Sequence, residues 1–159
     1  MGAFIGILVL AASAYVLYPR RISTHPVEVQ LTETQLRDQS DAIIRAKLLK
    51  SHAILMSPTD DSSVMTAWKL DVQKVYKGDI GKTATVAIPG GTFGGIQVVY
   101  EDAPEMKAGD SMIMYLRWLP EQKKWVIMSY LFGLRHIEQG MVTDALDVKQ
   151  DLATFEQSF

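Results

Sequence analysis

Histidine is the side chain that most often marks a metal or acid–base site, and this chain has three of them. His25, His52 and His136 are far apart, and no two have the spacing that places imidazoles on one face of a strand or helix. A zinc site needs several nitrogen, sulfur or carboxylate ligands that converge at about 2 Å. The chain has no cysteine, which excludes thiolate ligands, thiol nucleophiles and disulfides. We therefore expect no metal site.

A glycine-rich segment, residues 90–95, has the composition of a loop that presents backbone amides to an anion. A phosphate-binding P-loop also needs a Lys-Ser/Thr pair that opens a helix. Here a strand-forming run begins at Ile96 instead. The segment is therefore predicted to be a corner between strands, and no cofactor is expected.

The acidic and hydroxyl residues predict no catalytic site either. Asp60, Asp61 and the cluster at residues 101–105 lack the alternating spacing of a calcium loop. No serine lies in a Gly-x-Ser-x-Gly elbow. These groups are typical of solvated turns, and the sequence favours a protein that is not an enzyme.

Aromatic and basic residues flank one predicted hairpin and are the best candidates for binding a partner. Trp and Arg are the side chains that most often anchor protein interfaces. The candidates are Arg117, Trp118, Trp125 and, in the glycine-rich segment, Phe93. The alternative is stacking of single-stranded nucleic acid on the tryptophans. Acidic residues are interleaved and the net charge is −2, so no nucleic-acid partner is expected.

The elements that must position these residues are mostly strands. Residues 64–72 alternate between apolar and polar, which is typical of a half-buried strand, and a phase slip near Gln73 and Lys74 predicts a bulge. Thr32 and Gln35 form a capping box for a short helix, and a C-terminal helix is expected from Asp147. Further strands are predicted at residues 42–50, 83–88, 96–100, 111–119, 124–128 and 133–137.

The spacing of these strands predicts a mainly β fold: a small five- to six-stranded antiparallel OB-like barrel with short flanking helices, with a sandwich as the alternative. We divide the chain into residues 1–21, a membrane anchor or signal segment; residues 22–39, a linker and short helix; and residues 40–159, the barrel domain with its C-terminal helix.

Residues 2–18 contain no charge and predict an N-terminal transmembrane helix. Seventeen helical residues span roughly 25 Å, near the lower limit for a bilayer. A signal peptide cleaved after Ala12-Ser13-Ala14 and a buried core helix are the alternatives. The side chains expected to contact lipid are Phe4, Ile5, Ile7, Leu8, Val9, Leu10, Tyr15 and Tyr18.

Two stretches resemble the netrin-like domains, a family that includes the tissue inhibitors of metalloproteinases. Residues 40–50 (SDAIIRAKLLK) are similar to the first strand of these domains, and residues 68–78 to the next strand, which ends in Tyr76-Lys77-Gly78. Exported bacterial proteins show a similar strand end, followed by a Gly-Gly loop like Gly90-Gly91 and a turn like residues 106–110. The resemblance covers residues 40–137 and implies an OB-like barrel outside the cytoplasm.

The resemblance does not carry over inhibitor function, because those inhibitors place an N-terminal cysteine at the catalytic zinc and this chain has none. Arg20 and Arg21 follow the apolar segment and favour a cytoplasmic domain by the positive-inside rule. We follow the resemblance and expect a single-pass protein with an extracytoplasmic domain.

The function that these features favour is a membrane-anchored, non-enzymatic protein-interaction or scaffold module, such as an accessory subunit of a membrane complex. Its expected partners are the lipid bilayer and another protein. A netrin-like protease-inhibitor or peptide-binding domain and an OB-type single-strand binder are the alternatives.

Overall fold

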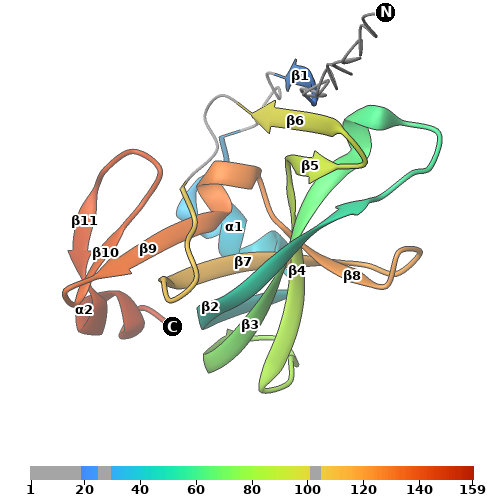
Figure 1. Cartoon of the computed structure of the whole chain (residues 1–159). Coiled ribbons are helices and arrows are strands. Elements are labelled where there is room, and N and C mark those ends of the chain that lie inside the picture. Colours follow the sequence, from blue (N-terminus) through green and yellow to red (C-terminus); the bar gives the residue numbers. More distant parts are fainter. Residues whose placement is uncertain (1–18, 25–29, 101–104) are drawn as a thin grey trace, which may run out of the picture.

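The computed structural model describes residues 19–24, 30–100 and 105–159 (Figure 1). The predicted anchor, from Phe4 to Tyr18, lies outside these ranges. Within them, no helix is both long enough and apolar enough to cross a bilayer.

The fold is mainly β, as predicted, with eight strands in its larger sheet. In sheet order these are β11 (Lys149–Asp151), β10 (Met141–Thr143), β9 (Leu134–Glu138), β7 (Ser111–Leu119), β2 (Ala42–Leu55), β3 (Val64–Lys77), β4 (Thr83–Pro89) and β8 (Lys124–Ile127). An additional pairing joins β8 back to β7. The sheet is not a clean barrel, because β9, β10 and β11 branch from β7 beside this closure.

A second sheet of three strands has the order β1–β6–β5. It consists of β1 (Arg20–Thr24), β5 (Gly91–Phe93) and β6 (Ile96–Tyr100), and β1 pairs with β6 in parallel. Strand β1 begins in the segment predicted as an anchor, residues 1–21, and ends in the one predicted as a linker and short helix, residues 22–39. The prediction of five to six strands is therefore too low, because very short strands such as β5, β10 and β11 leave little pattern to detect.

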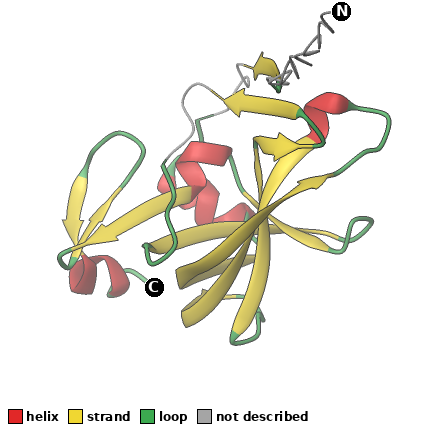
Figure 2. Ribbon diagram, in the orientation of Figure 1, coloured by secondary structure: helices red, strands yellow, loops and turns green. Residues whose placement is uncertain are grey.

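In the described part of the chain, helices are few and short (Figure 2). Helix α1 (Glu33–Gln39) begins at the predicted capping box of Thr32 and Gln35, and two 3-10 turns, η1 (Asp61–Ser63) and η2 (Tyr130–Gly133), join strands. The predicted start of the last helix at Asp147 is wrong. Asp147 has a left-handed φ of 61° in the connection between β10 and β11, and α2 (Leu152–Glu156) begins after Asp151, whose carboxylate accepts the Thr154 N–H.

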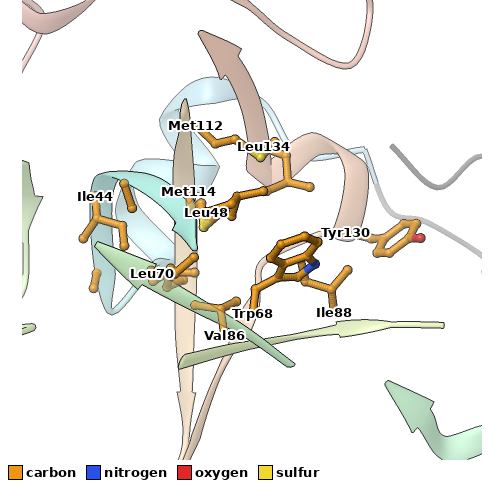
Figure 3. Close-up of a cluster of buried hydrophobic side chains, with 13 residues drawn as sticks. Ile44, Leu48, Trp68, Leu70, Val86, Ile88, Met112, Met114, Tyr130 and Leu134 are labelled. Carbon is orange, nitrogen blue, oxygen red and sulfur yellow. The ribbon is translucent and has the colours of Figure 1, made fainter. Parts of the chain in front are cut away.

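Two hydrophobic cores lie on opposite faces of the β2–β7 ladder. Figure 3 shows the first, in which Trp68 lies among aliphatic and methionine side chains from β2, β3, β4 and β7. The second gathers Leu36 of α1, Phe155 of α2 and Val142 of β10 against Ile43 and Tyr115. Consecutive residues of β2 and β7 therefore face different cores, and residues 42–44 and 112–116 are at most 1% exposed.

The β2–β3 ladder carries the predicted bulge. Arg45 is opposite Lys74 and Ala46 is opposite Val72, so Gln73 has no partner on β2. The ladder has two further irregularities, one of which, at Leu49, brings Lys50 opposite Lys69. Both lysines are exposed and, within the described residues, neither is in an ion pair.

Polar contacts of Glu156 hold α2 against the β2–β3 ladder. The Glu156 carboxylate accepts hydrogen bonds from Arg45, Lys74 and Tyr76 at 2.6 to 2.8 Å. The donors Lys74 and Tyr76 lower the pKa of Glu156, and the Arg45 charge adds to this against the opposing effect of burial. Glu156 thus neutralises the neighbouring cations Arg45 and Lys74.

We predict that the Glu156 contacts make the protein sensitive to acid. The pKa of folded Glu156 lies below its ordinary value of 4.5, so the stabilisation is complete above pH 4.5 and is lost as pH falls through the lower folded pKa. Glu156→Gln should flatten the decline of the unfolding free energy below pH 4.5, measured by urea titration. Glu138→Gln, at an exposed strand residue, is the control. Equal slopes in all three proteins would contradict the prediction.

We also predict that the Lys50–Lys69 pair destabilises the ladder, because like charges directly opposite each other repel. Lys69→Glu should raise the free energy of unfolding by about 0.5 kcal/mol at low salt, and added salt should reduce the gain. Lys47→Glu gives the opposite control, because it places a like charge opposite Asp71. A decrease in both variants would show that the greater net negative charge, rather than pairing, sets the effect, and would contradict the prediction.

Candidate functional site

The structure brings two of the predicted binding residues together. Trp118 of β7 and Trp125 of β8 are directly opposite each other, with ring centroids 5.1 Å apart and planes inclined at 58°. Trp118 is 39% exposed, whereas Trp125 is half-buried and packs against the first core. The two indoles form one aromatic surface. The β7–β8 hairpin that carries them is on the opposite side of the view from α2 (Figure 1).

The other two predicted residues do not join this surface. Arg117 is exposed and precedes Trp118 on an extended strand, so its side chain is on the opposite face. Phe93 is 42% exposed but belongs to β5 in the smaller sheet. An open cavity of about 530 Å³ at the tryptophans is lined by Asp41, Trp118, Pro120 and Trp125. We call this cavity, with its four lining residues, the tryptophan cavity.

Sequence reasoning missed Asp41, which is the one charged side chain among the described residues that line the cavity. Its Oδ2 accepts the backbone N–H of Trp118 at 2.8 Å, and its own N–H donates to the Leu116 carbonyl at 2.8 Å. Within the described residues, Asp41 has no ion pair. An exposed aspartate before a strand gives no sequence signal of this role, because its partner is 77 residues away.

The turn after β3 sets the position of Asp41. Gly78 has φ of +82°, and a Cβ there would lie 2.3 Å from the Asp41 carbonyl oxygen, so only glycine allows this approach. The preceding Lys77 donates to the carbonyls of Arg37 and Asp38 at 2.6 and 3.0 Å, which are at the C-terminal end of α1. The Lys77-Gly78 pair therefore ties α1, the start of β2 and the tryptophan cavity together.

The glycine-rich segment is a strand corner. Gly90 and Gly91 have φ of +97° and +136°, and the Gly90 carbonyl accepts the Thr66 hydroxyl at 2.7 Å. A Cβ on Gly91 would lie 2.7 Å from that hydroxyl oxygen. The glycines thus permit close packing of β4 and β5 on β3.

The described part of the chain contains no group of three His, Asp or Glu side chains able to hold a metal ion. His52 and His136 are on strands β2 and β9, which are separated in the sheet by β7, and His25 lies outside the described ranges. Asp60 caps η1, since its carboxylate accepts the Ser62 N–H at 2.9 Å.

A cluster of charged side chains, Glu33, Arg37 and Arg135, lines a second cavity beside α1. Arg135 is 8% exposed, and it donates to Glu33 at 3.0 Å and to the carbonyls of Phe132 and Leu134. Burial raises the pKa of Glu33, but the donors Tyr115 and Arg37 and the two arginine charges outweigh it, so this pKa is lowered. Contacts within the chain account for these charges, and the cluster therefore holds α1 against β7 and β9.

Comparison of the sequence with models of known protein families and with curated proteins finds no match.

We predict that the two tryptophans differ in what they contribute to stability. Trp125→Ala removes a half-buried ring from the core and should lower the free energy of unfolding by about 2 to 3 kcal/mol. Trp118→Ala loses mainly the contact between the rings, about 1 kcal/mol. Urea unfolding followed by the fluorescence of the buried Trp68 measures both. Equal losses would show that Trp118 also has a mainly structural role.

Proposed function

We propose that this protein is a non-enzymatic, membrane-anchored interaction module that binds another protein through the tryptophan cavity. The observation that carries the proposal is Trp118. It is a large aromatic side chain, 39% exposed, at an open cavity, and it is held by a ring contact with Trp125. Tryptophans of this kind supply much of the binding energy of protein interfaces.

Rigid support of the cavity favours binding. Trp118 and Trp125 are on paired strands, and the Trp118 backbone is hydrogen-bonded to Asp41. Little side-chain entropy is then lost when a partner docks, and preorganisation of this kind increases affinity. The Asp41 carboxylate disfavours a nucleic-acid strand at this surface, because it would repel the phosphates.

The finer architecture that we propose is an OB-type barrel of the netrin-like kind. Its support is the circuit of pairings through β2, β3, β4, β8 and β7, which includes a parallel β4–β8 pair. OB-folds are partly open, five-stranded Greek-key barrels. The two stretches that carry the resemblance also meet in space, because Gly78 packs against Asp41.

The membrane anchor and the extracytoplasmic location remain part of the proposal. Their support is the uncharged run at residues 2–18, which is long enough to reach across a thin hydrocarbon core, and the resemblance to exported proteins. In this arrangement the domain is an accessory subunit that stays beside a membrane complex.

We predict that Trp118→Ala abolishes capture of the partner. Full-length protein would be affinity-purified from its native membrane, with the copurifying proteins compared by mass spectrometry. Phe93→Ala is the matched control, since it removes an aromatic ring of similar exposure from the other sheet. A partner should copurify with the wild type and Phe93→Ala but not with Trp118→Ala. Equal capture by all three would exclude the tryptophan cavity as the interface.

A further inference from the structure

We propose that the tryptophan cavity binds an arginine side chain of the partner protein, with the guanidinium on the exposed face of Trp118 and beside the Asp41 carboxylate. The inference rests on the proposed function, because it names the chemistry of the group that enters the same cavity. Three observations lead to it: the exposed ring of Trp118, a carboxylate with no ion pair among the described residues and the apolar side chain of Pro120 in the lining.

The rings are suited to a cation. The face of an indole carries negative charge density and attracts ammonium and guanidinium groups more strongly than the rings of Tyr or Phe do. With a 58° inclination and centroids 5.1 Å apart, the two indoles leave no room for a cation between them. A planar cation would therefore stack on the exposed face of Trp118.

Asp41 makes the cavity selective for charge. One carboxylate oxygen accepts only the neutral N–H of Trp118, and the other has no hydrogen bond within the described part of the chain. A purely apolar ligand would desolvate this carboxylate without compensation, and an anion would be repelled. Only a cation can form an ion pair with the carboxylate and also stack on the Trp118 ring.

The basic residues next to the cavity do not supply that cation. Arg117 precedes Trp118 on β7 and, within the described residues, forms no ion pair with Asp41, and the Lys124 ammonium lies 3.6 Å from the sulfur of Met56. The ion pairs of the described residues join other groups. The carboxylate is thus available to a cation from a second molecule.

Arginine fits better than lysine. Its planar guanidinium stacks on an aromatic face and presents donors in a fork that matches a carboxylate. Its methylene stem can lie along an apolar surface, which Pro120 provides. Choline headgroups share the organic-cation chemistry, so the experiment must separate the two sources.

The test follows the indole N–H resonances of the full-length protein in detergent micelles by two-dimensional NMR, with the buried Trp68 as internal reference. The probe is N-acetyl-arginine methylamide, and its neutral isostere is the citrulline analogue. The arginine probe should shift the Trp118 and Trp125 resonances, and the citrulline analogue should bind about tenfold more weakly. Equal binding of the two would overturn the proposal.

Asp41→Asn tests the carboxylate while an amide oxygen still accepts the Trp118 N–H. It should weaken binding of the arginine probe about threefold, whereas Asp71→Asn, at an exposed aspartate of β3, should leave it unchanged. Tighter binding of choline than of the arginine probe would overturn the assignment to a partner side chain. If Trp118→Ala loses the partner but the arginine probe shifts neither resonance, the inference fails and the proposed function stands.

Discussion

Burial of the β2–β7 ladder on both faces is the constraint on which the rest of the structure depends. Residues 42–44 and 112–116 have almost no contact with solvent, because one core lies on each side of the ladder. A strand in this position cannot alternate apolar and polar residues, which explains the runs AII and MIMYL. Helices α1 and α2 and strand β10 pack against this ladder, and strand β8 pairs with its β7 edge.

The same ladder positions the residues that line the tryptophan cavity. Asp41 immediately precedes β2, and Trp118 lies two residues beyond the last buried residue of β7. The hydrogen bonds between Asp41 and residues 116 and 118 continue the ladder by one step. The backbone geometry therefore positions Asp41 and Trp118 next to each other, and the buried ladder extends directly to the exposed aromatic surface.

The sequence predicts local features better than long-range ones. The capping box at Thr32, the alternation of β3 over residues 68–72 and the bulge at Gln73 are confirmed because each depends on neighbouring residues. The helix start at Asp147 is wrong because a capping pattern also suits a turn, and there tertiary pairing forms β11. Trp118 and Trp125 could be chosen by residue type, but Asp41 reaches them only through folding. Its role could not be predicted from local sequence.

Parallel pairing of β1 with β6 has a consequence for how far the domain can reach. Only Pro19 lies between residue 18 and the first paired residue, Arg20, and one residue spans at most about 3.6 Å. A domain anchored through residues 2–18 would have almost no flexible linker between the anchor and its first strand. It could not sweep through the volume above the bilayer as a domain on a flexible linker does. Its search for a partner would be two-dimensional, by lateral diffusion among proteins of the same membrane.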